Sequence, residues 1–391
     1  MNFFQEAKSL LKVNIRDYGM YIALFVIMLT FTIMTDGLFI SSRNISNLLD
    51  ATGYIAVLAV GMTLVIVIRH IDLSVGFAAG FMGAIAAIML SQLGVPVYFT
   101  IPIILVLGIV IGMFNGVLVA SVGIPAFVSS LAGMLIFRGA LLQVTEKTGT
   151  IIVKDDTFNA LGNGFLPSFG KIAGLNVLSL ILGALVILYF VYAEVTKRNQ
   201  KIKYKFEVPS NKIFAIKLVF VSAIIAYVTW ILAGYNGFSW TVVITLLVVA
   251  IYHFLTTKTV LGRHIYAVGS NPEAAHLSGI NVKKITYIVF GSMGMLSALS
   301  GILYTARLQS ATTTAGTLFE LDAIAAAYVG GVSAAGGVGR VTGSIIGAVV
   351  MASLSSGMNL LGVGISYQYM IRGAVLALAV IFDVMTRRKR G

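Results

Sequence analysis

Long apolar stretches separated by short polar segments dominate the hydropathy pattern of this chain. A helix that crosses a bilayer needs roughly 20 mainly apolar residues, or about 17 at the short end. Twelve stretches meet or approach that length, and we predict a helix in each. They are Tyr18–Thr35, Gly53–Ile68, Val75–Leu90, Tyr98–Ala120, Ala126–Thr145, Ala173–Ala193, Leu218–Ala233, Phe238–Thr256, Ile285–Thr305, Asp322–Val338, Val341–Gly357 and Tyr369–Met385.

The segment Asp322–Val338 is the weakest of these candidates because Gly330, Gly331, Gly336 and Gly337 interrupt it. Non-helical backbone is tolerated at membrane depth only where it is buried in protein or faces water. We therefore expect either a full crossing or a broken, re-entrant segment there. Elsewhere, glycines recur four residues apart, which predicts close packing between neighbouring helices.

Composition excludes a soluble protein. Hydrophobic residues make up 58% of the 391 residues and charged residues only 10%, whereas soluble domains carry about 25% charged residues. Cysteine is absent, which excludes disulfide and thiolate chemistry. The fold class predicted from these features is an all-α polytopic membrane protein, with residues 1–391 forming a single transmembrane domain.

The positive charges are distributed unevenly along the chain. Lysine and arginine total 27 against 14 acids, giving a formal net charge of +13. With the N-terminus inside and every candidate span crossing, most of these bases fall on the inner side, as the positive-inside rule requires. This topology explains the excess of bases, so it does not indicate nucleic-acid binding. We expect both termini in the cytoplasm.

Two inner loops are polar enough to carry function. Residues 194–217 form a basic loop that we interpret as a topology anchor. Residues 258–284 differ in character, because Asn271-Pro272 indicates a helix cap and first turn, and Gly279 is a stop signal. A short inner helix there is either a solvated turn or a knob that receives force from a cytoplasmic partner.

Charged residues within or beside the spans suggest function by default, because charge is costly in a membrane. Asp72 and Asp322 stand at the starts of candidate spans, where an acid either caps the helix or takes part in gating. Arg138 and Arg372 lie within spans, where each either snorkels to an interface or faces a pathway.

Sequence signatures of catalysis are missing. There is no G-x-x-x-x-G-K-[ST] phosphate loop, no G-x-S-x-G elbow and no H-E-x-x-H helix. The four histidines have no ligand-like spacing. We therefore predict no catalytic residue and no metal site, and we expect any ATP hydrolysis on another chain.

Three ordered motifs carry a family resemblance. They are Ile71–Gly76, Leu277–Val282 following Arg263–Gly269, and Gly330–Ser333 continuing through Gly336–Arg340. Together they resemble the permease subunits of bacterial ATP-binding cassette (ABC) sugar importers, the ribose, arabinose, galactoside and xylose systems. The extra helical pair in the middle of the chain most resembles the D-xylose permeases.

The resemblance implies a vitamin B12-importer-type (type II) bundle of about 10–12 transmembrane helices, in the bacterial cytoplasmic (inner) membrane. It implies a second permease copy, cytoplasmic ATP-binding subunits that carry ATP and Mg, and a periplasmic sugar-binding protein. No cofactor is expected on this chain. The inner helix would correspond to the coupling helix that contacts the ATPase, formed by Asn271, Pro272, Glu273, Ala274, Ala275, His276, Leu277 and Gly279.

The function that the resemblance implies is ATP-driven import of a monosaccharide, D-xylose or a related pentose or hexose. The alternatives are an ABC permease for a nucleoside, a branched-chain amino acid or a furanosyl signal, and an ATP-independent sugar facilitator. Neutral polyhydroxylated cargo suits hydroxyl, amide and aromatic groups. The candidate pathway residues are Asn115, Phe127, Ser129, Ser130, Met134, Arg138, Tyr328, Asn359 and Tyr367.

Overall fold

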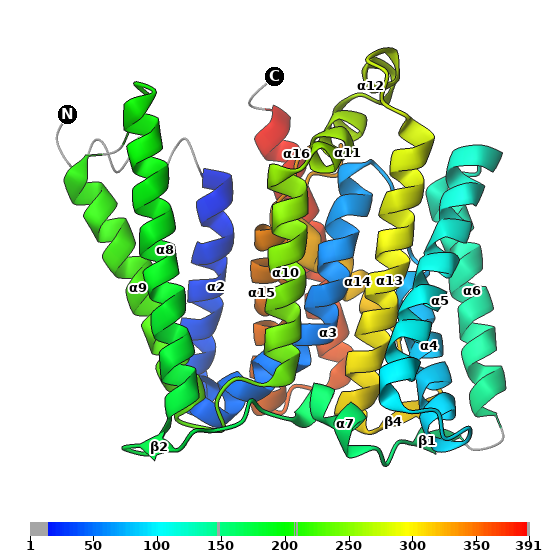
Figure 1. Cartoon of the computed structure of the whole chain (residues 1–391), viewed down its shortest axis with the longest axis horizontal. Helices are drawn as coiled ribbons and strands as arrows, with labels where there is room; N and C mark the ends of the chain where they lie inside the picture. The colour runs from blue at the N-terminus through cyan, green and yellow to red at the C-terminus, as the bar shows by residue number, and fades with distance from the viewer. Residues whose placement is uncertain (1–14, 147–148, 207, 209, 389–391) are drawn as a thin grey trace. The chain divides into compact units, whose positions relative to one another are not determined.

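The computed structural model describes residues 15–146, 149–206, 208 and 210–388 (Figure 1). The contacts divide the chain into two compact units. The smaller unit contains Ile40–Asn47 and Phe165–Ser239. The larger unit contains Arg16–Phe39, Leu48–Gly164 and Trp240–Gly391.

The larger unit holds most of the helices and one two-stranded antiparallel sheet, in which β1 (Thr150–Ile152) pairs with β4 (Ser310–Thr312). A 3-10 turn η1 (Leu38–Ile40) follows the first described helix, and a π-helical turn η2 (Leu118–Val122) ends the fourth. The helices are α2 (Ile15–Met34), α3 (Ser42–Val67), α4 (Val75–Ser91), α5 (Val97–Val117), α6 (Ala126–Thr145), α7 (Asp156–Asn163), α10 (Trp240–Lys258), α11 (Val260–Ser270), α12 (Pro272–Leu277), α13 (Val282–Leu308), α14 (Phe319–Val329), α15 (Val341–Leu360) and α16 (Ile365–Arg388).

The smaller unit is a helical hairpin. Helices α8 (Val177–Lys203) and α9 (Asn211–Ala233) pack on each other, and the short strands β2 (Lys171–Ile172) and β3 (Leu175–Asn176) precede α8. This hairpin is the extra helical pair that the sequence predicts. Much of the predicted basic loop 194–217 is helical, because α8 continues to Lys203 and α9 begins at Asn211.

Among the described residues, nine helices are long and apolar enough to cross a membrane, and two shorter apolar helices span Gly19–Met34 and Val75–Ser91. The chain is therefore a mostly helical, multi-pass membrane protein, consistent with the predicted all-α class. The tenth candidate, Asp322–Val338, is not a continuous helix. Helix α14 ends at Val329, and a loop with left-handed glycines at 331, 336 and 337 follows it.

Several helix starts differ from their predicted positions, and α3 and α8 illustrate two of the reasons. Helix α3 begins at Ser42, well before the predicted Gly53, because a polar segment that hydropathy does not detect continues the helix. Helix α8 begins at Val177 instead of Ala173, because Ala173 and Gly174 have φ values of 50° and 80° in the β2–β3 turn. A left-handed backbone at these positions is incompatible with a continuous helix.

Helix α13 forms the centre of the larger unit. It packs against α4 and α5, and residues such as Phe290, Met293 and Leu296 are almost completely buried. Glycines allow these backbones to approach: a Cβ atom on Gly112, which lies four residues from Gly108 and Gly116 in α5, would be 2.1 Å from the carbonyl oxygen of Phe290 in α13. The glycine spacing therefore marks helix packing, as the sequence predicts.

Candidate functional site: the α11–α12 end of the larger unit

Helix α12 forms where the sequence predicts the short inner helix. The side chain of Asn271 caps it by accepting a hydrogen bond from the backbone N–H of Ala274 at 3.0 Å, and Pro272 occupies the first helical position. Gly279 follows the helix with φ 83°. The local structure predicted for this segment is confirmed.

The surface of α12 is unusually open. Leu277 is 87% exposed, and its neighbours Glu273 and Ala274 are also exposed, whereas Ala275 is buried. Figure 1 shows α12 at the same end of the larger unit as α11 and the C-terminal part of α16, with β1, β4 and α7 at the opposite end. Leu277 is the most exposed large hydrophobic side chain among the described residues, so it is available for contact with a partner.

Helix α11 anchors α12 to the bundle. Its N-cap is Thr259, whose hydroxyl accepts from the N–H of Gly262 at 3.1 Å, and Ile265 and Val268 are buried. The Tyr266 hydroxyl donates to the carbonyl oxygen of Gly339 at 2.6 Å, and burial raises the pKa of this phenol. Helix α11 is thus fixed to the segment that follows α14.

Arg69 makes a second link to α11. Its Nε donates to the carbonyl oxygen of Gly269 at 2.7 Å, and its Nη2 donates to the carbonyl oxygen of Ser270. Arg69 itself has a left-handed backbone, with φ 65°. The sequence pattern alone gives Arg69 no specific role, because neither its backbone conformation nor a partner 200 residues away can be read locally.

We use the name glycine-rich loop for residues 330–340. The N–H of Gly337 donates to the carbonyl oxygen of Val67 at 2.8 Å, which joins this loop to the end of α3. The Ser333 hydroxyl and the Ala334 N–H donate to Oδ2 of Asp383 in α16 at 3.2 and 3.3 Å. The loop therefore contacts α3, α11 and α16.

A buried polar network surrounds the Ile71–Gly76 motif. Oδ1 of Asp72 accepts from the N–H and the hydroxyl of Ser74 at 2.9 and 2.6 Å, and Nδ2 of Asn115 donates to the Ser74 hydroxyl at 3.1 Å. Burial raises the pKa of Asp72, while its hydrogen bonds from Ser74 act in the opposite direction. Asp72, Ser74 and Asn115 are all at most 5% exposed.

Asp72 does not cap α4 directly, which corrects one of the two roles expected for it. The N-cap residue is Ser74, and no side-chain hydrogen bond caps the helix. Asp72 instead fixes the turn that leads into the helix. Asp322 makes no cap either, because the N-cap of α14 is Leu318, without a side-chain cap. Asp322 pairs through Oδ2 with Nη1 of Arg372 in α16 at 3.3 Å.

Two of the candidate pathway residues lie at the Ile71–Gly76 motif. Asn115 bonds to Ser74, and the Ser130 hydroxyl reaches the carbonyl oxygen of Ile71 at 3.4 Å. Ser129 lies one residue away and is 4% exposed, and its hydroxyl has no hydrogen-bond partner within the described part of the chain. These α5 and α6 residues form one polar region.

The other candidates are dispersed. On α6, Phe127 is 59% exposed, Met134 is half-buried, and the exposed Arg138 guanidinium lies 5.6 Å from the ring centroid of Phe77. Tyr328 is half-buried on α14. At the α15–α16 turn, Asn359 accepts from Gln368 at 2.8 Å and Tyr367 is exposed. One copy of the chain therefore does not gather all nine candidates at one place.

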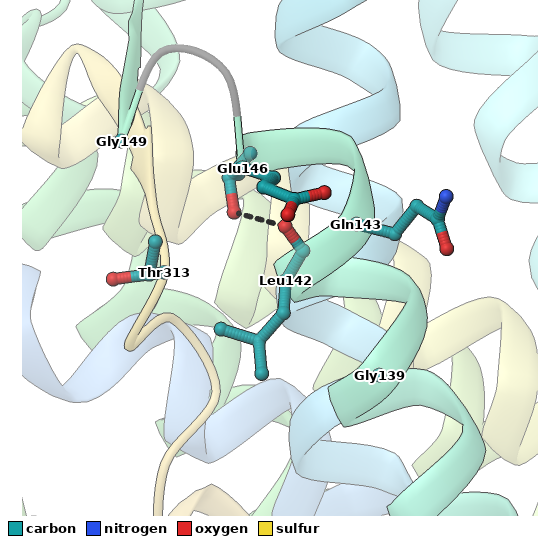
Figure 2. Close-up of a pocket in the computed structure, with 7 residues that line it drawn as sticks. Gly139, Leu142, Gln143, Glu146, Gly149 and Thr313 are labelled. Carbon is teal, nitrogen blue, oxygen red and sulfur yellow. Dashed lines mark hydrogen bonds between the residues drawn. The ribbon is translucent and has the colours of Figure 1, made fainter.

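An open pocket of about 330 Å³ lies at the far end of α6 (Figure 2), lined by Gly139, Leu142, Gln143, Thr145, Glu146, Gly149 and Thr313. The Thr145 hydroxyl is bonded within its own helix, to the carbonyl oxygens of Leu141 and Leu142. None of the candidate pathway residues lines this pocket. Across the residues that the structure describes, no three His, Cys, Asp or Glu side chains are grouped to hold a metal ion.

Comparisons with known proteins agree with the motif resemblance. The chain is 39% identical to the xylose transport system permease protein of Escherichia coli over 386 residues, covering 99% of this chain and 95% of that protein. It is 40% identical to the Haemophilus influenzae protein of the same name over 381 residues, covering 97% and 99%.

A ribose import permease protein of Escherichia coli is 36% identical over 347 residues, covering 88% of this chain and 87% of that protein. No solved structure matches the chain. The family model described as "Branched-chain amino acid transport system / permease component" matches residues 44–380. The chain therefore belongs to this family of membrane transport permeases.

Proposed function

We propose that the chain is the permease subunit of an ABC importer that moves D-xylose, or a closely related pentose or hexose, into the cytoplasm. The relatives named as xylose transport permeases support this cargo, because their similarity covers nearly the whole of both chains. The observation that carries the proposal is the exposed, capped helix α12, whose Leu277 is 87% exposed. An ATPase on another chain would bind this helix and move it during its ATP cycle.

The proposed orientation places α12 in the cytoplasm. Lys258 and Lys284 flank the α11–α12 segment, and the basic inner end of the α8–α9 hairpin agrees with the same topology under the positive-inside rule. Both termini would then be cytoplasmic, in the inner membrane. The β1–β4 sheet and α7 would lie at the periplasmic end, where a sugar-binding protein delivers its cargo.

The proposed assembly contains two permease copies, two cytoplasmic ATP-binding subunits and a periplasmic sugar-binding protein. The bundle would be of the vitamin B12-importer type, with a route formed between the two copies. Dispersal of the candidate pathway residues over α6, α14 and the α15–α16 turn fits a route that a single copy does not complete. ATP and Mg would be held by the ATPase subunits, with no cofactor on this chain.

The polar region of Asp72, Ser74, Asn115 and Ser130 is proposed to stabilise the start of α4 beside this route. Alternating access would follow when ATPase closure moves α12 and shifts the population between two arrangements of the bundle. Neutral sugar cargo requires no fixed charge in the route.

Reconstitution tests this proposal. The permease and its ATPase are placed in proteoliposomes with ATP in the lumen, which represents the cytoplasm. The sugar-binding protein is added outside, and uptake of labelled D-xylose is measured. We expect uptake that requires all three components and hydrolysable ATP, and that unlabelled leucine does not compete for. Xylose flux through the permease alone would contradict the proposal and indicate an ATP-independent facilitator.

A further inference from the structure

We propose that Arg69 is the positioning residue that transmits movement of α12 to the glycine-rich loop, and through it to the end of helix α14. This inference rests on the proposed function, because it assumes that a partner moves α12. It assigns a role to a residue that lies outside α12 and outside the candidate pathway. Hydrogen bonds, close packing and a left-handed backbone at the junction of α3, α11 and the loop support this role.

The first contact is electrostatic as well as geometric. Gly269 and Ser270 are at the C-terminal end of α11, where carbonyl oxygens lack partners in their own helix and the helix dipole is negative. The guanidinium of Arg69 donates to both carbonyl oxygens, using two N–H groups of one rigid fork. A single side chain from the turn after α3 thus holds the end of the helix that precedes α12.

The second contact holds the loop at the same point. The carbonyl oxygen of Val67, two residues before Arg69, accepts from the N–H of Gly337 at 2.8 Å. A Cβ atom on Gly269 would lie 1.9 Å from this same carbonyl oxygen, and one on Gly336 would lie 2.3 Å from Cγ of Arg69. The three segments are in direct contact with no space between them.

The third feature is the backbone of Arg69, which has φ 65°. This conformation is unfavourable for a residue with a Cβ atom, and it persists only where surrounding contacts fix it. It turns the chain after α3 so that the side chain reaches α11. Glycine would adopt this backbone with less strain, but it has no guanidinium. The presence of arginine here therefore indicates that its hydrogen bonds to α11 outweigh the backbone strain.

The loop passes the constraint onward. Its Ser333 and Ala334 bind Asp383 in α16, and the N–H of Val332 donates to the carbonyl oxygen of Ala327 in α14 at 3.0 Å. Because packed junctions of this kind move as bodies and do not deform gradually, a displacement of α11 reaches the end of α14 through the loop. The hydrogen bond from Tyr266 to Gly339 is a second link between α11 and the loop.

The test uses the complete importer in proteoliposomes, with three measurements: co-purification of the ATPase, its rate of ATP hydrolysis, and D-xylose taken up per ATP hydrolysed. Arg69→Gln keeps a polar side chain but removes the charge and the fork. We expect normal assembly and hydrolysis, with xylose per ATP lowered at least tenfold. Arg69→Lys should recover a substantial part of that loss, because an ammonium still donates to helix carbonyls.

Lys212→Gln is the control, because Lys212 is an exposed cation of α9 and lies outside the junction. It should leave all three measurements unchanged. Tyr266→Phe removes only the hydrogen bond to Gly339 and should lower xylose per ATP two- to fivefold. If Arg69→Gln fails to assemble, the milder Tyr266→Phe variant provides the test. An unchanged amount of xylose per ATP in Tyr266→Phe would then overturn the proposal.

An unchanged ratio in Arg69→Gln would overturn the proposal directly. So would equal defects in Arg69→Gln and Arg69→Lys, which would indicate steric disturbance instead of a lost cationic link. These outcomes differ from failure of the proposed function itself. If the proposed function is wrong, the unmodified complex itself shows no ATP-dependent xylose uptake.

Discussion

Gly108 in α5 and Gly294 in α13 face each other so closely that neither position accommodates a side chain. A Cβ atom on Gly108 would lie 2.4 Å from the carbonyl oxygen of Gly294, and a Cβ atom on Gly294 would lie 2.1 Å from that of Gly108. Membrane helices gain stability from close van der Waals packing, because lipid supplies no hydrophobic force between them. This crossing is therefore a principal contact of the bundle.

Gly294→Ala should destabilise the folded permease by about 1–3 kcal/mol, the usual cost of forcing extra volume into a packed core. The expected result is a lower thermal unfolding midpoint in detergent. Gly373→Ala in α16 is the matched control, since a Cβ atom there meets nothing within 4 Å. A Gly294→Ala midpoint equal to or above that of the control would show that α5 and α13 separate easily.

Leu277→Asn should weaken binding of the ATPase subunit. Burying a leucine side chain contributes about 1.5–3 kcal/mol, so we expect an affinity loss of roughly tenfold to a hundredfold. Affinity is measured by titrating purified ATPase onto the detergent-solubilised permease. The control is Ile202→Asn on α8, which alters another exposed aliphatic residue, 51% exposed. Equal affinities for the two variants would exclude Leu277 from the docking surface.

Sequence reasoning located the structural units well where the signal is local. Helix α12 was predictable because a cap, a proline and a stop glycine lie within nine residues. The glycines after Val329 indicated a break there as one of two expected outcomes. The helical pair α8–α9 followed from its two apolar runs. In each case the determining chemistry lies in consecutive residues.

The links between segments were not predictable. Arg69 contacts carbonyl oxygens about 200 positions away, and Asp72 bonds to Ser74 instead of capping α4. A carbonyl oxygen carries no residue-specific signal, so no pattern in the sequence indicates which one a guanidinium will reach. The candidate pathway was dispersed for a related reason: residue type suggests chemistry, but only tertiary packing decides which side chains share a surface.

Asp72→Asn should make stability less dependent on pH. Burial raises the folded-state pKa of Asp72 above the ordinary value of about 3.9. The neutral carboxyl's stabilisation is fully present below that ordinary pKa, and it is lost as the pH rises through the raised pKa. Asparagine has the same shape, and its oxygen accepts the same hydrogen bonds from Ser74 without ionising.

The thermal midpoint of Asp72→Asn should therefore exceed that of the unmodified chain at pH 8, with the difference shrinking as the pH falls toward 5. Asp156→Asn, which replaces an exposed acid in the first turn of α7, is the matched control. A constant difference for Asp72→Asn across this range would show that the carboxyl stays ionised at no cost.

Asp322 and Arg372 should be energetically coupled, because their 3.3 Å ion pair joins α14 to α16 with side chains only 21% and 25% exposed. Exposed pairs contribute up to about 1 kcal/mol, whereas breaking a buried pair costs about 3–5 kcal/mol. This half-buried pair should fall between them, near 1–2 kcal/mol. Asp322→Asn alone leaves the guanidinium unpaired, as Arg372→Gln leaves the carboxylate.

The double variant removes both charges, so its loss of stability should be smaller than the sum of the two single losses. Thermal or denaturant unfolding of all four proteins gives the coupling free energy. The more exposed pair of Lys217 and Glu194, at 2.6 Å, supplies the reference cycle, and its coupling should be below about 1 kcal/mol. Strictly additive losses for Asp322 and Arg372 would mean that α14 and α16 are held together by packing alone.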